Sequence, residues 1–270
     1  MDVKKYTSAN REAWNEVTPI HQKARDVDYK IEFAKPGYST LDETITSKLN
    51  EIGIKGKDVG QLCCNNGRET LSMVNLGAKS GIGFDISDEA IVEASSLAKI
   101  SGLDCRFIRT DVYDIDESYY NKFDLILITI GALYWLPDLV KFFGIVSKML
   151  REDGTLVIYE EHPFCNMLSF EGEPEFEPDN PLKIHFSYFK DEPWVENDGI
   201  DYIGKSKYDS KTNYGWSYKI SDIINPIASN GFRIKEFNEY RTDISSEFDH
   251  LNEETKVPLS YILVANNQFG

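Results

Sequence analysis

The chain has 270 residues, of which 41% are hydrophobic, so it is long enough to bury the core of one large α/β domain with an insertion. Its formal net charge of -16 argues against nucleic acids and anionic membranes as partners, because both are bound through clustered Lys and Arg, and leaves small or cationic ligands. No apolar stretch approaches the ~20 residues that span a bilayer, and the N-terminus lacks an apolar signal segment, so we expect a cytoplasmic protein.

The N-terminal segment, residues 1–52, is predicted to be helical. Residues 7–24 carry Trp14 on a helical pattern that Pro19 interrupts. A second helix is predicted over residues 39–52, where apolar residues recur at helical spacing. Because both helices precede the first strand, we expect the segment to fold over the mouth of the sheet as a lid. A helix that only packs against the core is the alternative.

The stretch from Asp58 to Asp85 has the strand, turn, helix and strand pattern of a βαβ unit, with the turn at residues 65–67. In such a unit the turn and the helix N-terminus form a polar cradle, and an acid at the tip of the second strand can bind both hydroxyls of a ribose. A dinucleotide fingerprint has glycine where Cys63 and Asn65 stand. Because Cys63 would adopt a left-handed backbone only at a cost, the turn favours a nucleoside without phosphate over a pyrophosphate. An ordinary ligand-free turn is the alternative.

Strands and helices continue to alternate as far as residue 163, which implies a parallel, doubly wound sheet. The predicted elements are a helix over 87–102, a strand over 104–109, a strand over 123–131, a helix from 137 that ends at 153–154, and a strand over 155–160. The strand over 123–131 is almost wholly apolar, which is typical of a central strand covered on both faces.

The pattern changes after residue 163. Residues 164–216 are rich in aromatic and acidic side chains, and alternation over residues 183–188 predicts a short strand. We interpret residues 164–216 as an inserted, β-rich subdomain on the substrate side, since a structureless loop of this length is unusual. Segments 53–163 and 217–270 would together form the sheet domain.

The C-terminal part is predicted to add a helix and an antiparallel pair of strands. The helix covers residues 217–230 and is bent or shortened by Pro226. Strands follow at 232–240 and 259–265 with no helix between them, so they should pair as a hairpin at the sheet edge.

The cysteines show no metal-ligand spacing, so we expect reduced thiols and no metal site. They are Cys63, Cys64, Cys105 and Cys165.

The stretch VGQLCCNNG that ends at Gly67 resembles the first turn of the class I S-adenosylmethionine-dependent methyltransferases. In that family a strand ends in an acid and runs into a G-x-G-x-G turn. Gln61 stands at the acid position, Cys63 and Asn65 at the first two glycines, and Gly67 at the third. A subset of bacterial, small-molecule-type members looks similar and continues with T-L-S, as this chain does at residues 70–72.

The resemblance covers residues 58–163 and, more weakly, the C-terminus. It implies a doubly wound, mostly parallel, seven-stranded Rossmann-like sheet with an antiparallel C-terminal hairpin. It implies that S-adenosyl-L-methionine is the cofactor, with Asp85 on the ribose and Asp111 at the adenine amino edge. The cofactor-binding residues implied are Gln61, Cys63, Asn65, Gly67, Asp85, Ile86, Asp111, Val112, Thr129 and Ile130.

The function that the resemblance implies is methyl transfer by in-line displacement to an O or N atom of a small molecule. Such a reaction depends mainly on aligning the acceptor and excluding water. Glu160 and His162 are the candidate bases, because with Glu161 they form a titratable cluster at a strand end. Tyr134 and Trp135 could present aromatic faces to the sulfonium.

Two other functions fit the same residues. A nicotinamide-dependent oxidoreductase would also use Asp85 on a ribose, although the missing glycines and the second acid at Asp111 argue against it. A non-catalytic protein that binds S-adenosylmethionine or another nucleoside is the third hypothesis, and the altered Gln61, Cys63 and Asn65 turn supports it.

Overall fold

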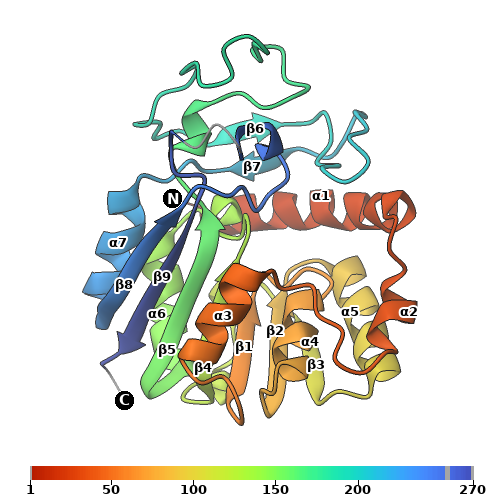
Figure 1. The fold of residues 1–270 in the computed structure, drawn as a ribbon, viewed down its shortest axis with the longest axis vertical. Coiled ribbons are helices and arrows are strands. Elements are labelled where there is room, and N and C mark those ends of the chain that lie inside the picture. Colours follow the sequence, from red (N-terminus) through yellow and green to blue (C-terminus); the bar gives the residue numbers. More distant parts are fainter. Residues whose placement is uncertain (1, 253–255, 269–270) are drawn as a thin grey trace.

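The computed structural model describes residues 2–252 and 256–268, and within them a seven-stranded sheet carries the fold. The strand order is β3-β2-β1-β4-β5-β9-β8 (Figure 1). Strands β1 to β5 pair in parallel, and β9 pairs antiparallel with both β5 and β8. The predicted doubly wound sheet with an antiparallel C-terminal pair is therefore confirmed. The strands are β1 Asp58–Leu62, β2 Ser80–Asp85, β3 Cys105–Arg109, β4 Phe123–Thr129, β5 Leu150–Glu161, β8 Phe232–Tyr240 and β9 Ser260–Asn267.

Helices cover both faces of the sheet. On one face α3 and α4 pack on alternate strand residues such as Leu125, whereas α6 and α7 pack on the opposite face, on residues such as Ile126. Both of these β4 residues are fully buried, which confirms the prediction of a central strand covered on both faces. The helices are α1 Val3–Ala24, α2 Tyr29–Phe33, α3 Glu43–Glu51, α4 Arg68–Asn75, α5 Asp88–Ser101, α6 Leu139–Met149 and α7 Ile220–Ser229.

Helix α1 begins before the predicted range, at Val3, and it runs through Pro19 to Ala24. Contacts on both sides of the proline hold it: Asn15 accepts hydrogen bonds from Ser87 Oγ and Asp88 N, and His21 Nε2 lies 3.1 Å from the carbonyl of Ile200. Tertiary contacts thus compensate for the backbone donor that a proline lacks. The expectation that Pro19 would interrupt the helix was wrong.

Helix α6 ends earlier than predicted. Leu150 already has an extended backbone and pairs with Phe123, so Asp153 and Gly154 lie inside β5 and do not terminate the helix. Asp153 has a φ of 57°, and the pairing between β4 and β5 shifts register here. Asp153 and Gly154 therefore lie at an irregularity in the pairing of β4 with β5.

The insertion contains a small separate sheet. Its strands are β6 Trp194–Glu196 and β7 Asn213–Gly215, which pair antiparallel (Figure 1). Residues 183–188 do not form the predicted strand, because the amides of His185 and Phe186 both donate to the carbonyl of Met167 instead of to a partner strand.

Long-range contacts bring α1 and β7 together above the sheet. Asn10 of α1 donates to the carbonyl of Tyr214 at 2.9 Å and accepts from its amide at 2.7 Å. Figure 1 shows α1 lying across the ends of the strands, with the β6–β7 hairpin above it. The N-terminal segment and the insertion therefore meet at the carboxyl edge of the sheet.

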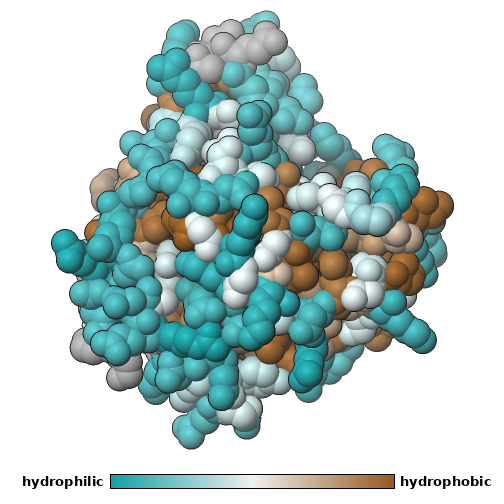
Figure 2. All heavy atoms as spheres, turned by 60° about the horizontal axis from the view of Figure 1, so that its bottom comes forward, coloured by the Kyte–Doolittle hydropathy of each residue, from teal (hydrophilic) through white to brown (hydrophobic). Residues whose placement is uncertain are grey.

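The surface is largely polar, in keeping with the charge of the chain. Figure 2 shows mostly hydrophilic residues around smaller hydrophobic areas on the face turned forward.

At the amino edge of the sheet Arg151 forms ion pairs with Asp58 and Asp124. No helix in the described ranges is both long and apolar enough to cross a membrane.

Candidate functional site

The turn after β1 adopts a left-handed backbone at three positions. The φ angles are 55° at Cys63, 48° at Asn65 and 74° at Gly67. Cys63 thus adopts the conformation that we expected it to adopt only at a cost. Hydrogen bonds hold the turn, because Cys64 N donates to the carbonyl of Phe84 and Gly67 N to that of Cys64. These contacts offset a local cost of about 1–2 kcal/mol for the cysteine.

Gly67 is the position in this turn that no larger residue fits. It precedes α4, and a Cβ atom there would lie 2.3 Å from the ring of Phe107. The third glycine of the family's turn therefore has a steric reason in this chain as well as a conformational one.

Asp85 ties the turn to the end of β2. Its Oδ2 accepts from Asn65 N at 2.7 Å and its Oδ1 from Ser87 N at 2.8 Å. Burial raises the pKa of Asp85 above its ordinary value, although these amides act in the opposite direction. Each carboxylate oxygen keeps a second lone pair, so the side chain can accept two further hydrogen bonds.

Asp111, at the end of β3, is held by α1. Its Oδ2 accepts from Thr7 Oγ1 at 2.7 Å and from Lys4 Nζ at 2.9 Å, while Oδ1 accepts from Tyr113 N. The neighbouring Val112 is buried in the core. The first turns of α1 thus close over one of the predicted site residues, and the sequence analysis did not identify Lys4 or Thr7.

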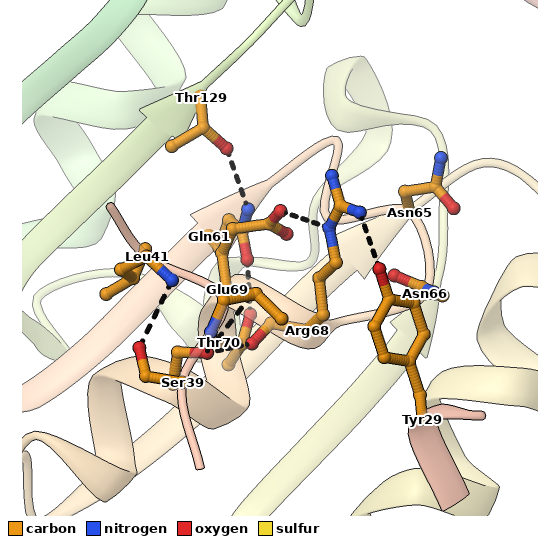
Figure 3. Close-up of polar contacts among 12 residues, drawn as sticks. Tyr29, Ser39, Leu41, Gln61, Asn65, Asn66, Arg68, Glu69, Thr70 and Thr129 are labelled. Atoms are coloured by element: carbon orange, nitrogen blue, oxygen red, sulfur yellow. Dashed lines mark hydrogen bonds and ion pairs between the residues drawn. The ribbon is translucent and has the colours of Figure 1, made fainter. Parts of the chain in front are cut away.

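Gln61 is fully buried and joins three elements below the turn. Its Nε2 donates to Thr129 Oγ1 of β4 at 3.1 Å, and its Oε1 accepts from Thr70 Oγ1 of α4 at 2.5 Å (Figure 3). At the position of the family's acid, this chain therefore has a neutral amide whose partners are both hydroxyl groups.

Arg68 is a basic residue in the first turn of a helix, where the helix dipole favours acids. Its Nε donates to Glu69 at 2.6 Å and its Nη1 to the hydroxyl of Tyr29 at 3.0 Å (Figure 3). The sequence analysis did not single it out, although its place directly after Gly67 was the available signal.

Glu160, at the end of β5, binds the loop that follows β4. Its carboxylate accepts from Gly131 N at 2.5 Å and from Leu133 N at 3.1 Å. Burial raises the pKa of Glu160 to about 7, against the effect of these amides. Both carboxylate oxygens of Glu160 therefore already accept hydrogen bonds from the backbone. Ile130, at the start of this loop, is 38% exposed.

His162 faces the antiparallel edge of the sheet. Its Nδ1 accepts from Phe164 N at 3.0 Å, and its Nε2 lies 3.0 Å from the carboxylate of Glu239 on β8. Burial lowers the pKa of His162, whereas Glu239 acts in the opposite direction. Nδ1 is thus engaged in a hydrogen bond, whereas the buried Nε2 approaches Glu239 without forming one.

Cys63 lies where the predicted residues converge. Burial and then the charges of Asp85, Glu160 and Asp111 raise the pKa of its thiol well above the ordinary value. The carboxylates at the ends of β2, β3 and β5 therefore all lie within electrostatic reach of the thiol at the end of β1. Ile86, directly after Asp85, is partly exposed at the same edge.

Aromatic side chains lie next to this edge. Trp135 packs edge-on against Trp14 of α1 and against Tyr134, with ring centroids 5.3 and 5.0 Å apart. Tyr134 and Trp135 belong to a short 3-10 helix, η3 Leu133–Trp135, that Glu160 holds through its backbone.

The family model described as Methyltransferase domain matches residues 55–177. An S-adenosylmethionine-dependent methyltransferase from Mesorhizobium loti has the same fold, with a TM-score of 0.59 and 18% identity over 82% of this chain and 96% of that one. Residues 55–177 thus match a methyltransferase domain, and the chain has the fold of S-adenosylmethionine-dependent methyltransferases. A magnesium protoporphyrin IX methyltransferase from Synechocystis, solved with bound SAH, has a TM-score of 0.58 and 14% identity over 97% of this chain and 99% of that one.

Curated relatives match this chain over shorter stretches. A tRNA U34 carboxymethyltransferase from Campylobacter fetus is 31% identical over 107 residues, 40% of this chain and 37% of that protein. A ribosomal protein L11 methyltransferase from Haemophilus influenzae is 27% identical over 108 residues, 40% of this chain and 34% of that protein. The chain thus spans less than half the length of the curated relatives that it matches.

Proposed function

We propose that this chain transfers a methyl group from S-adenosylmethionine to an O or N atom of a small molecule by in-line displacement. The observation that supports this most is that Asp85, Asp111 and Glu160 lie at the ends of β2, β3 and β5, on the carboxyl edge of a fold shared with S-adenosylmethionine-dependent methyltransferases. When bound, the cofactor supplies an electrophilic methyl group on a sulfonium. The chain itself must align the acceptor with this methyl group and exclude water from the reacting atoms.

The cofactor site fits the residues that surround it. Asp85 has two free lone pairs for ribose hydroxyls, and the absence of a side chain at Gly67 lets the turn pack closely against Phe107. We assign Ile86 and Val112 to the adenine surroundings, with Asp111 at its amino edge. The other members of the site are Gln61, Cys63, Asn65, Thr129 and Ile130, which form or support the turn and the end of β4.

We assign to residues 1–52 the role of a lid on this site. Helix α1 is joined to the end of β3 by hydrogen bonds from Thr7 and Lys4 to Asp111. It is joined to the start of α5 by a hydrogen bond from Arg11 to Asp88. Trp14 also covers Trp135. Closing such a lid would exclude water from the reacting atoms.

Glu160 is proposed as a positioning residue. Its two oxygens accept backbone amides of the loop that carries Tyr134, so it orients this loop rather than accepting a proton from the substrate. We assign a structural role to His162 as well, because its Nδ1 accepts from Phe164 N and its Nε2 faces Glu239 of β8. An acceptor that is already nucleophilic needs no base.

A small molecule is the acceptor class that the charge favours. Relatives act on tRNA and on a ribosomal protein, as their names state. With a net charge of -16, however, this chain has no electrostatic advantage toward a polyanion such as tRNA. The insertion and α1, which meet above the sheet, are proposed to select the acceptor.

Calorimetry with SAH, S-adenosylmethionine and NAD(P)H tests the proposal. We expect micromolar binding of the first two and none of the nicotinamides, which would exclude the oxidoreductase. A radiolabelled methyl-transfer assay on a panel of alcohols, phenols and amines then separates an enzyme from a non-catalytic binding protein. Absence of SAH binding would refute the proposed function.

A further inference from the structure

Three glutamates lie within electrostatic reach of one tyrosine beside the proposed cofactor site. Glu161 ends β5, Glu196 ends β6, and Glu247 belongs to the loop that follows β8. Burial raises the pKa of the Tyr134 hydroxyl, and the charges of these same three glutamates raise it further. We call Glu161, Glu196 and Glu247 the acidic cluster.

The β6–β7 hairpin faces this tyrosine. Gly215 lies directly against it, because a Cβ atom on Gly215 would be 1.9 Å from the ring of Tyr134. Asn213 is two residues away on the same strand and therefore shares this face. It also pairs directly with Glu196, and directly opposed residues project from the same side of a sheet. Glu196 and Asn213 thus both point toward Tyr134.

Asn213 carries an unused hydrogen-bond acceptor. The residue is 1% exposed, and its Nδ2 donates to the carbonyl of Glu196 at 3.4 Å, which determines the orientation of the amide. Its buried Oδ1 has no partner among residues 2–252 and 256–268. Leaving such a group unsatisfied costs about 1–3 kcal/mol, so an occupant that donates a hydrogen bond here is favoured.

The acidic cluster also has no cation paired with it. Within the described part of the chain, no Lys, Arg or His forms an ion pair with Glu161, Glu196 or Glu247. The side chain of Ser245 bonds to Glu161, and Lys205 acts on Glu247 only as the weakest of its influences. A cluster of acceptors without a counter-charge is complementary to a cation.

The pKa values of all three glutamates are raised. Burial is the largest cause for all three, and it raises the pKa of Glu161 well above its usual range and that of Glu247 to about 7, while Glu196 is also raised. Neighbouring acids add to the effect. They are Glu160, Glu173, Asp198 and Asp243, together with the mutual repulsion of the cluster.

We propose that the acidic cluster binds the cationic nitrogen of the methyl acceptor, so that the substrate is an organic amine or ammonium compound. This inference rests on the proposed function. Glu161 directly follows Glu160, whose carboxylate holds the backbone on either side of Ala132, so the cluster lies next to the site assigned to the cofactor. The face of Tyr134 adds a cation–π contribution that suits an ammonium group.

An organic cation fits better than a metal ion. The described residues hold no group of three or more His, Cys, Asp or Glu arranged for a metal. Carboxylates spread around an aromatic ring match a larger cation, because its charge is distributed over several hydrogen-bond donors.

The test compares matched probes by calorimetry at pH 8. Phenethylammonium is measured against its neutral analogue 2-phenylethanol, with methylammonium as a small probe and MgCl₂ as the metal probe. We expect both ammonium probes to bind at least tenfold more tightly than the alcohol and than Mg²⁺. Glu196→Gln and Glu247→Gln should each lower ammonium affinity at least fivefold, whereas the exposed Glu192→Gln should not change it.

Two further measurements, Tm without ligand and SAH affinity, show whether a loss of ammonium binding reflects misfolding or failure of the proposed function. Without ligand, Glu196→Gln and Glu247→Gln should raise Tm, because each removes repulsion from a half-buried cluster, so a loss of binding would not reflect misfolding. Equal binding of amine and alcohol, preferred binding of Mg²⁺, or unchanged affinity in both variants would overturn the inference. SAH affinity is measured in parallel: its absence refutes the methyltransferase proposal, while ammonium binding is a separate result.

Discussion

Removing the carboxylate of Asp85 gives the sharpest test of the cofactor site. The side chain is 9% exposed, and each of its oxygens accepts one backbone amide, from Asn65 and from Ser87. The remaining lone pairs are those that we assign to the two ribose hydroxyls. Asp85→Ala therefore removes both ligand contacts and leaves two backbone donors without their acceptor.

The expected loss of affinity follows from these contacts. Hydrogen bonds to a charged group contribute roughly 1.5 to 3 kcal/mol each, so two of them amount to about 3 to 6 kcal/mol, or about 10² to 10⁴ in Kd. The fold should lose less than that. The raised pKa of Asp85 shows that burying its charge already opposes the stabilisation from its two amides.

Titration calorimetry with SAH at pH 7.5 measures the effect, with the exposed Asp104→Ala as the matched control. We expect Asp85→Ala to lower the affinity at least a hundredfold, whereas Asp104→Ala should bind as the parent does. If a folded Asp85→Ala variant binds SAH within threefold of the parent, the ribose assignment is wrong.

The remaining predictions concern the turn, the lid and the loop. Gly67→Ala should lower the free energy of unfolding by about 2 to 4 kcal/mol, whereas Gly53→Ala, with a similar φ of 72° and open space around it, should lose only about 1 kcal/mol in denaturant titrations. Thr7→Val should speed SAH release about fivefold in stopped-flow experiments, through loss of a hydrogen bond of about 1 kcal/mol, while Thr18→Val on the same helix should not. Glu160→Gln should lower kcat more than SAH affinity, and a general fall in Tm and affinity together would contradict a positioning role. The pKa of Glu160 is about 7 in the folded protein and 4.5 ordinarily. As the pH rises from 4.5 through 7, the parent should therefore lose up to about 3 kcal/mol of folding stability relative to Glu160→Gln. A stability difference that does not depend on pH would refute the buried charge.

Local patterns in the sequence determined most of the sheet. The apolar run of β4 predicted a strand covered on both faces, and the spacing from Asp58 to Asp85 predicted a βαβ unit, because periodicity and turn chemistry depend only on near neighbours. The helix predicted over residues 87–102 is α5, which Ser87 and Gly102 cap in the structure. The two C-terminal strands paired antiparallel as predicted, since no helix separates them.

The tertiary structure decided the features that depend on distant contacts. Pro19 lies inside a helix because residues on both sides of it are held by other elements, and Cys63 has a positive φ because the neighbouring strand pins the turn. The strand expected at residues 183–188 found no partner strand, and strand propensity without a partner does not make a sheet.

The candidate site divides in the same way. Asp85 and Asp111 could be placed from the sequence, because the carboxyl ends of parallel strands meet at one edge. The roles of Glu160 and Thr7 could not, since their partners lie 29 and 104 residues away along the chain. Sequence patterns report hydrogen bonds and packing among neighbours, whereas the partners of a buried polar group are determined only when the folded chain brings remote segments into contact.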